Sequence, residues 1–557
     1  MTDETKEYTD VPDKGLFFVA LGGVGEIGMN FYLYACDGDW LAVDCGVGFA
    51  GDRLPGIDML LPDPSFAEKI APRLKGLVIT HAHEDHIGAV ATFWPGLRCP
   101  VYVSAFGAEM LETRLDEAGL LGRVPVRIFE QGDLLDLKPF EIELFSINHS
   151  IPEASSLLIK TPYGNVFHTG DWRFDEDPVV GDPVDYKALR ALKKEKILAL
   201  VGDSTNVFVE GDIPSESAVK TALTELFAAY KGKRLIVTCF ASNVGRIESI
   251  AEAAEKNGRT VCLLGRSLWR VEGAGRAAGY FRGVPVFLTE EEAAEHDPSE
   301  ILYLCTGCQG EPKAALSNIS YGTGAVQPVK GDVVVFSSRV IPGNEQAIAN
   351  IQNRFIAKGI EVITVKEALV HVSGHSGRKD MAKLYEFLKP KIAVPVHGEA
   401  AHLYEHAGLA ADCGVEKTVI VKDGDVLCLS SEAPEIIGEV KTGVLARDRK
   451  QIIPLNAGVL KQRRRMIDEG TVVATVVLDK KGMVSGPVQF SAVGLIENTD
   501  PVLQQMDAAV KQAVDLLAAE KRSDDQIVAD TVKSAVRKVV METHGRRPMV
   551  ETHLVRI

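Results

Sequence analysis

Apolar and polar positions alternate in short runs through the first two hundred residues of the chain. The runs LFFVAL (16–21), MNFYLYACDGDWLAVD (29–44) and LKGLVIT (74–80) are rich in aromatic and β-branched residues and stand between turn signals. Such runs predict strands, and the DGD tripeptide predicts a tight turn between two of them. Residues 16–205 therefore predict a domain built largely from short strands.

The pattern changes between residues 206 and about 365. A helical stretch at 216–230 leads to RLIVTCF, after which apolar strand-like runs alternate with helices that begin near Val244 and near Asn344. This alternation predicts a mostly parallel, doubly wound sheet. A helix at 379–388 and short strands then return up to about residue 442. We therefore expect an α/β unit inserted into the first domain.

These changes of pattern predict the domain boundaries. The first domain covers residues 1–207 and 366–445, the inserted domain covers 208–365, a linker covers 446–460, and a small α+β domain covers 461–557. In the last domain, apolar residues recur at helical spacing, which is typical of a core face, and we expect them to serve packing and self-association. They are Leu503, Met506, Val510, Val514, Leu517, Ile527, Val528, Val532, Val536 and Val540.

Length and composition narrow the class of protein. A chain of 557 residues is too long for a single core. No apolar run approaches the roughly 20 residues that a bilayer-spanning helix needs, and the acidic start MTDETKEYTD lacks a signal-peptide pattern. Nine cysteines, an odd number, favour a reducing compartment over a disulfide framework. We therefore expect a cytoplasmic multidomain protein with no membrane partner.

The charge pattern limits how the chain could bind nucleic acid. A net charge of −16 argues against a general basic surface for polyanions, although a local basic channel remains compatible with it. A solvated linker and a nucleic-acid contact are equally good interpretations of the densest basic stretch. That stretch contains Arg447, Arg449, Lys450, Lys461, Arg463, Arg464 and Arg465.

Two short motifs are weaker than they first look. LGGVGEIGMN (21–30) contains G-x-G-x-x-G, with Asp44 farther on, but a strand rather than a helix is predicted after it. A dinucleotide site needs a helix N-terminus there, so we favour glycines that let one strand turn closely into the next. Cys305 and Cys308 lack a second pair and a histidine at finger spacing, and we expect a strand-end loop.

The segment THAHEDHIG carries the strongest chemical signal. It follows the predicted strand LKGLVIT directly and contains His81, His83, Asp85 and His86. Two imidazoles at positions i and i+2 after a strand can face the same way, and the turn that follows brings Asp85 and His86 round to a neighbouring point. Four ligand-type side chains in six positions therefore favour a site for two metal ions.

Other residues lie where such a site needs them. His149 lies in FSINHS, Asp171 follows the strand VFH, and His397 ends VPVH. A carboxylate such as Asp171 can bridge two divalent ions. Imidazole and carboxylate together suit zinc best, with manganese or magnesium as alternatives. His168 lies inside a strand, which favours a buried structural role.

This set resembles the metallo-β-lactamase superfamily, whose motif H-x-H-x-D-H matches residues 81–86 at every position. The resemblance implies an αββα sandwich in which Asp44 supports the metal site by fixing a ligand. The inserted unit resembles the β-CASP domain of nucleases, whose acidic motif matches Asp203 and whose histidine motifs match His371 and His397.

Six motifs in order resemble the bacterial ribonuclease J family more closely still, from about residue 16 to the C-terminus. They are GGVGEIG, GDSTN, FASNVGR, TGCQGEP, HVSGHSG and VPVHGE. Cys308 departs from the small polar residues common at its position. The resemblance implies a 5′-to-3′ exoribonuclease, in some members also an endonuclease, that prefers single-stranded RNA with a 5′ monophosphate and acts in RNA decay and maturation.

The resemblance also assigns roles to residues. His81, His83 and His149 would hold one divalent ion, Asp85, His86 and His397 a second, and Asp171 would bridge them. His371 is the candidate to protonate the leaving 3′ oxygen or to stabilise its charge, and a strand-end hydrogen bond is its alternative role.

A pocket for the 5′ phosphate is expected at the Gly-rich HVSGHSG segment, which can offer backbone N–H groups to an anion. Ser242 and Asn243 precede a helix N-terminus, another natural phosphate position, although ordinary helix capping would also explain them. The expected substrate-binding residues are Ser242, Asn243, Val372, Ser373, Gly374, His375 and Ser376.

Two other functions remain open. A DNA nuclease of the same branch would carry the same motifs, because the sequence does not show whether the site demands a 2′-hydroxyl. A non-catalytic subunit of an RNA-decay complex is disfavoured because every ligand position is filled. By resemblance we expect a homodimer or tetramer formed through the C-terminal domain, and association with other RNA-decay enzymes is a further expectation.

Overall fold

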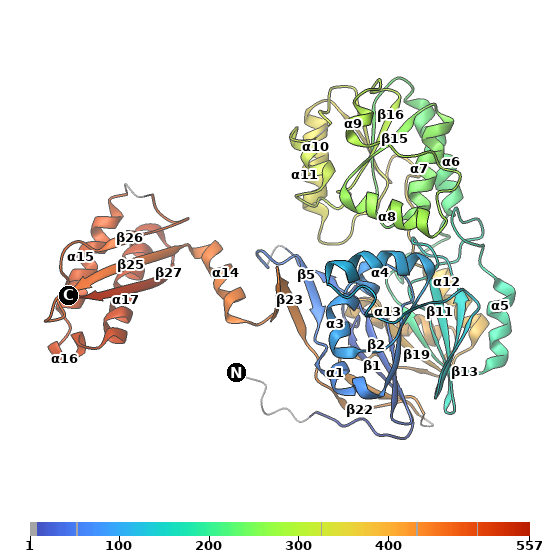
Figure 1. The fold of residues 1–557 in the computed structure, drawn as a ribbon, viewed down its shortest axis with the longest axis horizontal. Coiled ribbons are helices and arrows are strands. Elements are labelled where there is room, and N and C mark those ends of the chain that lie inside the picture. The colour runs from blue at the N-terminus through green and yellow to red at the C-terminus, as the bar shows by residue number, and fades with distance from the viewer. Residues whose placement is uncertain (1–7, 52–53, 325, 431–432, 498–499) are drawn as a thin grey trace. The chain divides into compact units, whose positions relative to one another are not determined.

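The computed structural model describes residues 8–51, 54–324, 326–430, 433–497 and 500–557 (Figure 1). Residues 1–7, part of the segment in which we expect no signal peptide, lie outside these ranges. The chain divides into two units. One comprises Met1–Phe49 with Leu60–Val444, and the other comprises Ala50–Met59 with Leu445–Ile557.

The larger unit contains two facing sheets. In spatial order, the strands of the first are β22 (Glu435–Glu439), β21 (Asp425–Cys428), β1 (Leu16–Gly22), β2 (Phe31–Cys36), β3 (Asp39–Val43), β6 (Leu74–Val78), β7 (Val101–Val103) and β8 (Val126–Ile128). Those of the second are β20 (Lys417–Thr418), β19 (Ile392–Val396), β13 (Ile197–Asp203), β12 (Gly164–His168), β11 (Ser155–Thr161), β10 (Phe140–Ser146) and β9 (Leu134–Leu137).

Side-chain alternation along the strands explains the layers. Leu157 and Ile159 of β11 lie in the core between the sheets, whereas Leu158 packs with helices on the other face, because neighbouring strand residues point to opposite sides. The helices of this unit are α1 (Ser65–Ile70), α2 (Glu84–Ile87), α3 (Val90–Leu97), α4 (Ala105–Glu117), α5 (Tyr186–Ala191), α12 (Arg378–Leu388) and α13 (Ala400–Asp412). The predicted αββα sandwich is confirmed.

The inserted region forms a separate sheet of five parallel strands. In spatial order they are β15 (Thr260–Leu264), β16 (Ile301–Cys305), β14 (Leu235–Thr238), β17 (Val333–Phe336) and β18 (Glu361–Ile363). The surrounding helices are α6 (Glu216–Ala229), α7 (Val244–Lys256), α8 (Arg266–Ala277), α9 (Glu290–Ala293), α10 (Ala315–Tyr321) and α11 (Glu345–Ala357). Leu235 and Val237 face one core and Ile236 the other, so both faces are covered, as predicted for a doubly wound sheet.

The smaller unit has a three-stranded sheet in the order β26 (Gln489–Ser491), β25 (Thr471–Leu478) and β27 (Met549–Arg556). Its other elements are β24 (Gln451–Pro454), α14 (Gly458–Glu469), α15 (Val502–Asp515), α16 (Ala519–Arg522) and α17 (Asp525–His544), with β23 (Val444–Asp448) at its start. The predicted apolar positions except Ile527 belong to the core that this sheet shares with α15 and α17, where Val510 and Val536 are fully buried.

Two details differ from simple expectation. The apolar run VQFSAVGLI (488–496) predicts one strand, but the strand covers only Gln489–Ser491. Farther on, Gly494 adopts a left-handed φ of 72° within a turn. Residues 446–460 contain β24 and parts of β23 and α14. The domain boundaries themselves stay a prediction. Within the described ranges, each helix is too short or too polar to span a lipid bilayer.

Candidate metal centre

The candidate ligands come together because they follow neighbouring parallel strands. β12, β13 and β19 are parallel neighbours, and Asp171, Asp203 and His397 lie at or just beyond their carboxyl ends. In the facing sheet, β3 and β6 are also parallel neighbours. Asp44 and His81 follow those two strands. Carboxyl ends of parallel strands meet at one edge of a sheet, so residues far apart in the sequence become neighbours.

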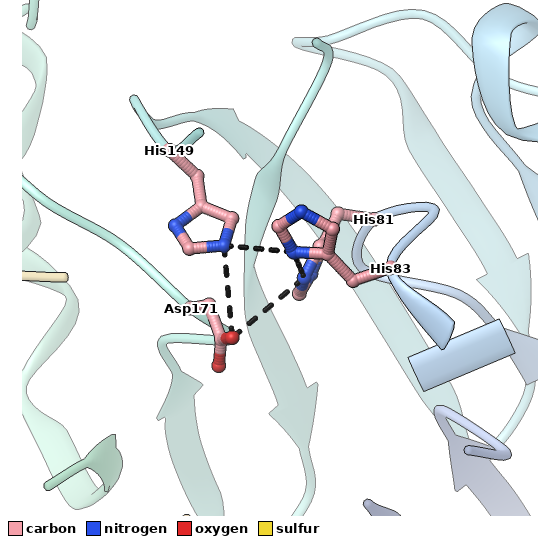
Figure 2. A group of neighbouring side chains, drawn as sticks. All are labelled: His81, His83, His149 and Asp171. Atoms are coloured by element: carbon pink, nitrogen blue, oxygen red, sulfur yellow. Dashed lines mark hydrogen bonds and ion pairs between the residues drawn. The ribbon is translucent and has the colours of Figure 1, made fainter. Parts of the chain in front are cut away.

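The first group contains His81, His83, His149 and Asp171, whose candidate ligand atoms all lie within 4.8 Å of one another. Nδ1 of His83 lies 3.1 Å from Nε2 of His81 and 3.0 Å from Nε2 of His149. Figure 2 shows the three rings converging beside the carboxylate, with Oδ2 of Asp171 3.7 Å from Nε2 of both His81 and His149. Ligands around tetrahedral zinc stand about 3.3 Å apart, so this spacing fits a metal ion.

The second group contains Asp85, His86, Asp171 and His397. Nε2 of His86 lies 3.2 Å from Oδ2 of Asp171, and Nε2 of His397 lies 3.5 Å from the same oxygen. Oδ2 of Asp85 lies 3.7 Å from Nε2 of His86 and 3.8 Å from Nε2 of His397. Two imidazoles and two carboxylates therefore face a second common point.

Asp171 belongs to both groups through a single oxygen, Oδ2. Its other oxygen, Oδ1, is buried and has no hydrogen-bond partner among the described residues. A buried carboxylate oxygen without a donor is costly unless a cation or a proton satisfies it. The residues present thus fit a pair of cations bridged at Asp171.

Neighbouring groups orient three of the imidazoles through their Nδ1 atoms. Nδ1 of His86 donates to Asp44 at 2.7 Å, that of His149 to the carbonyl of Gly374 at 2.7 Å, and that of His397 to Oδ1 of Asn30 at 2.8 Å. A neutral imidazole that donates through Nδ1 keeps a bare lone pair on Nε2, which is the form that binds metal.

Asp44 reaches both groups. It accepts the hydroxyl of Thr80 at 2.9 Å, and that hydroxyl lies 3.0 Å from Nδ1 of His81. Asp44 is fully buried and has a left-handed φ of 60°. Through His86 directly and through Thr80 indirectly, one carboxylate thus orients a histidine of each group.

Burial and charge set the protonation states of the first group. Burial lowers the pKa of His83 to about 4 and lowers the pKa values of His81 and His149 well below the ordinary value. Burial alone would raise the pKa of Asp171, but surrounding histidines, led by His397, outweigh it and hold that pKa well below its usual range. Neutral imidazoles beside an ionised carboxylate are the states that metal binding requires.

The second group differs in one respect. Burial works to lower the pKa of His86, but the carboxylates of Asp171, Asp44 and Asp85 outweigh it and raise that pKa well above the ordinary value. A cation that binds at this group must therefore displace a proton from His86.

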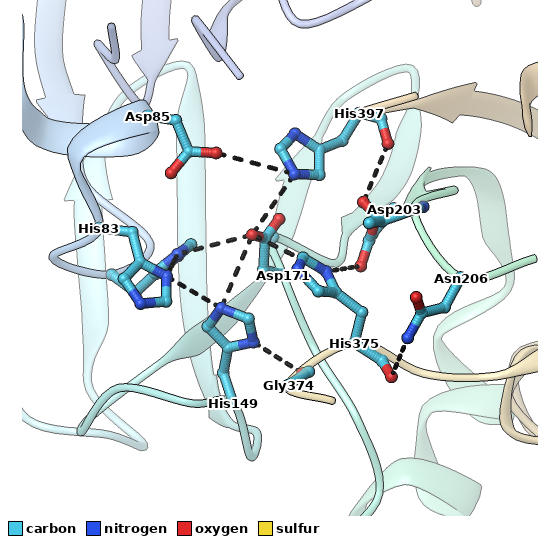
Figure 3. Close-up of polar contacts among 12 residues, drawn as sticks. His83, Asp85, His149, Asp171, Asp203, Asn206, Gly374, His375 and His397 are labelled. Atoms are coloured by element: carbon cyan, nitrogen blue, oxygen red, sulfur yellow. Dashed lines mark hydrogen bonds and ion pairs between the residues drawn. The ribbon is translucent and has the colours of Figure 1, made fainter. Parts of the chain in front are cut away.

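Asp203 and His375 form a third group together with Asp171 and His397, and the candidate ligand atoms of these four residues also lie within 4.8 Å of one another (Figure 3). Nδ1 of His375 lies 2.8 Å from Oδ2 of Asp203 and 4.0 Å from Oδ2 of Asp171. The ring of His375 also stacks near that of His397, with ring centroids 5.8 Å apart. Asp203 is fully buried and tied to a histidine of the HVSGHSG segment.

His371 lies elsewhere. Among the described residues it belongs to none of the groups that could hold a metal, and its Nδ1 lies 3.2 Å from Nη1 of Arg246. Burial lowers its pKa well below the ordinary value, and Arg246 adds to that effect. The catalytic role expected of His371 stays a prediction, and His375 has the contacts that such a role needs.

The expected phosphate-binding residues are only partly gathered. Asn243, Val372, Ser373 and Gly374 line a cavity of about 30 Å³, whereas Ser242 does not. The side chain of Asn243 accepts the N–H of Arg246 at 2.8 Å and thereby caps α7, the alternative role considered above. The role of these residues in substrate binding stays a prediction.

Ser376 is fully buried. Its backbone N–H donates to Trp172, and its hydroxyl has no partner among the described residues.

Sequence patterns missed several residues that hold this site. Asn30 orients His397 and also lies 2.9 Å from Nε2 of His86, yet it was visible only as the end of a glycine-rich run. Asn206 donates to Oγ of Ser373 at 2.8 Å and to the carbonyl of His375 at 2.9 Å. The GDSTN motif contained Asn206, but no rule of spacing pointed to its partners.

Models of four known domain families match the chain. A metallo-β-lactamase superfamily model matches residues 24–209, a ribonuclease J β-CASP domain model 232–355, a Zn-dependent metallo-hydrolase RNA specificity domain model 346–421, and a ribonuclease J C-terminal domain model 458–557. These matches agree with the sandwich, the inserted sheet and the small C-terminal unit. They support a metal-dependent hydrolase that binds RNA.

Curated relatives match over nearly the whole chain. The chain is 42% identical to ribonuclease J of Sinorhizobium meliloti over 98% of both chains. It is 36% identical to ribonuclease J of Mycolicibacterium smegmatis, again over 98% of both, and 35% identical to ribonuclease J 1 of Streptococcus pyogenes over 95% of this chain and 96% of that one.

A solved structure of a protein of unknown function from Enterococcus faecalis shares the fold, with a TM-score of 0.51 and 14% identity, covering 74% of this chain and 100% of that one. At such low identity it supports the fold alone. The chain is similar to the curated relatives over nearly its full length, and the ribonuclease J domain models match it. It therefore belongs to the ribonuclease J family of metal-dependent ribonucleases.

Proposed function

We propose that the chain is a 5′-to-3′ exoribonuclease that hydrolyses single-stranded RNA with two divalent cations and prefers a 5′ monophosphate. The observation that carries the proposal is the pair of ligand groups that share Oδ2 of Asp171, beside the loop that contains His375. Two divalent cations held there would supply a water-derived nucleophile at neutral pH and neutralise the charge that develops on the phosphate. The imidazole and carboxylate donors suit zinc best.

The residues of the chain would position the reaction. Asp44, Asn30 and the carbonyl of Gly374 orient the imidazoles of His86, His397 and His149, which keeps the ligand atoms in place without reorganisation. We assign proton donation to the leaving 3′ oxygen to His375 rather than His371. Burial works to lower the pKa of His375, but the carboxylates of Asp203 and Asp171 outweigh it and raise that pKa. The ring can then hold a proton on Nε2 in addition to the Nδ1 proton that it donates to Asp203.

The preference for a 5′ monophosphate is supported by the cavity beside the first group. Its lining includes His149, Arg173, Asn243, Ser373 and Gly374, which offer amide, hydroxyl and backbone polar groups around a space of only about 30 Å³. A space of this size holds about one water molecule, so even a single phosphate must widen it to bind and a triphosphate would have to widen it further. A phosphate seated there would place the first internal linkage near Asp171.

The experiment follows mononucleotide release from single-stranded RNA that bears a 5′ monophosphate, triphosphate or hydroxyl, with matched DNA. Wild type is compared with His81→Ala. Rapid processive release from the monophosphate RNA alone, lost in the variant, supports the proposal. Equal cleavage of all three RNA ends would point to an endonuclease, and equal degradation of DNA to a DNA nuclease. Absence of metal-dependent cleavage would favour a non-catalytic subunit.

We also propose that the C-terminal unit mediates self-association. Leu516 and Val493, at 80% and 76% exposure, are large apolar side chains on this unit that no described residue covers. Light scattering on the full chain should give the mass of a dimer or tetramer, and a monomer at micromolar concentration would refute this part.

A further inference from the structure

The loop formed by residues 370–376 is held by two buried arginines whose charges are both compensated. Arg173 forms an ion pair with Asp175 and donates to a carbonyl of the loop at 2.8 Å. Arg246 pairs with Glu216, with Nε 2.6 Å from Oε1, and donates to another loop carbonyl at 2.9 Å. Each guanidinium thus has a carboxylate of its own, which is the usual state of a buried structural arginine.

Arg339 lies beside the same loop but has no such partner. Its Nη1 donates to Oδ1 of Asn206 at 2.6 Å. In the part of the chain that the structure describes, its guanidinium makes no other hydrogen bond and forms no ion pair. A guanidinium has five N–H donors, and one neutral amide uses only one of them. Arg339 therefore presents an uncompensated, half-buried cation with most of its donors free.

The backbone at Arg339 is held by two hydrogen bonds to the side chain of Gln309. Arg339 follows β17 at the carboxyl end of the parallel sheet, where ligands of such folds bind. Nε2 of the buried Gln309 donates to the carbonyl of Arg339 at 2.7 Å, and its Oε1 accepts the N–H of Ile341 at 2.9 Å. The backbone that carries the guanidinium is therefore held in place before any ligand binds.

Arg339 also lies close to the reacting groups. Asn206, its partner, donates to the carbonyl of His375 at 2.9 Å. Burial lowers the pKa of Arg339, while the charge of Asp203 opposes that shift, so the guanidinium and the Asp203 carboxylate lie within electrostatic range. The guanidinium thus lies within electrostatic range of both Asp203 and His375.

We propose that Arg339 binds a phosphate of the RNA substrate. This anion would neutralise the charge of the guanidinium and accept hydrogen bonds from its free N–H groups. A guanidinium can grip two phosphate oxygens at once, which a lysine cannot. In a chain of net charge −16, such a local cation is what draws a polyanion to one place. The inference rests on the proposed nuclease function. The phosphate is either an internal linkage or the 5′ terminus, and the two share one chemistry.

The test measures the dissociation constant of the full-length protein for a phosphorothioate RNA, which resists hydrolysis, at several salt concentrations. The RNA carries either a 5′ monophosphate or a 5′ hydroxyl. Arg339→Gln removes the charge but can still donate to Asn206. Arg339→Lys keeps the charge but cannot donate two parallel N–H groups to one phosphate. Arg354→Met is the matched control, because it removes a charge from α11 of the same inserted domain.

Arg339→Gln should weaken binding about 10- to 100-fold and reduce the slope of log affinity against log salt by about 0.7, as expected for one lost phosphate contact on a single strand. Arg339→Lys should keep the slope and lose less affinity, and Arg354→Met should match wild type. Equal losses on both RNAs assign an internal phosphate, and a loss confined to the monophosphate RNA assigns the terminal one.

Wild-type affinity and slope in Arg339→Gln would overturn the inference while leaving the nuclease function intact. Failure of the nuclease function would appear separately, as wild-type protein that releases no mononucleotides. Thermal unfolding of each variant guards against a folding defect. If Arg339→Gln does not fold, Arg339→Lys decides, because unchanged affinity together with an unchanged rate of release by that variant would exclude a forked phosphate contact.

Discussion

The two ligand groups around Asp171 and the loop at 370–376 face each other but are built in opposite ways. In the ligand groups, the side chains lie beyond strand ends or in the short helix α2, and neighbours such as Asp44 and Asn30 orient several of them. The loop has no regular structure of its own. Its carbonyls are fixed by arginines, among them Arg246 on α7. The proposed chemistry thus depends on local motifs, whereas the proposed recognition depends on contacts between the sandwich and the inserted sheet.

This difference explains why substitutions in the two regions should fail differently. A change at a ligand should abolish metal binding and with it all hydrolysis, whatever the RNA. A change in the loop or its supports should leave the metals bound and alter the rate or the choice of substrate.

Replacement of the shared carboxylate should have the largest effect. Asp171→Asn removes the charge that both groups face, so we expect loss of metal from both and a fall in hydrolysis on the order of 10⁴-fold or more. Metal content by mass spectrometry and single-turnover rates on monophosphate RNA would measure this. Full metal occupancy in the variant would show that the two groups do not depend on Asp171.

Substitution of the two histidines of the loop should have the next largest effects, and the two losses of rate should differ. His375→Ala should lower the single-turnover rate by about 10²- to 10⁴-fold with metal content unchanged, because it removes the proton donor held by Asp203. His371→Ala is the matched comparison and should lose much less, since its ring lies against Arg246. The reverse order of effects would return the acid role to His371.

Replacement of a residue that orients the ligands should have a smaller effect than replacement of a ligand itself. Asp44→Asn leaves the packing nearly unchanged but weakens the orientation of His86, and through Thr80 that of His81. We expect metal affinity to fall by about 10- to 100-fold, the usual cost of losing such a support, with activity restored by added metal. Titration with zinc against a competing chelator would measure it, and unchanged affinity would remove Asp44 from this role.

The smallest effect should come from Thr80→Val. The variant keeps the backbone donor to Asp44 at 2.8 Å but loses the hydroxyl that links Asp44 to His81. One such hydrogen bond is worth about 0.5–1.5 kcal/mol, so metal affinity should fall about 2- to 10-fold. Because His81 belongs only to the first group, the loss should be confined to one of two titration steps. Equal weakening of both steps would contradict the geometry.

The sequence indicated which residues come together around Asp171, and the reason is physical. Strand periodicity and ligand spacing are local properties, so His81 and His83 could be recognised from six consecutive residues. The inserted parallel sheet was likewise predicted from alternation of strands and helices, and helices such as α7 begin at the predicted residue.

The roles of residues at the 370–376 loop were harder to predict from the sequence, because they depend on contacts between distant segments. Two histidines four residues apart, His371 and His375, are equivalent in the sequence, and only Asp203 on a distant strand distinguishes them. The same holds for Arg339, whose lack of a carboxylate partner depends on the arrangement of three separate segments. The helix cap of Asn243 could be considered in advance, but its partners could not.

The measurement that tests the account most directly is the number of metal ions bound by the full-length protein, followed together with activity. The account predicts two equivalents of zinc per chain, with hydrolysis of 5′-monophosphate RNA reaching its maximum only when the second equivalent is bound. Full activity with a single equivalent, or a second equivalent that binds without effect on hydrolysis, would contradict the proposal that the two groups at Asp171 act together.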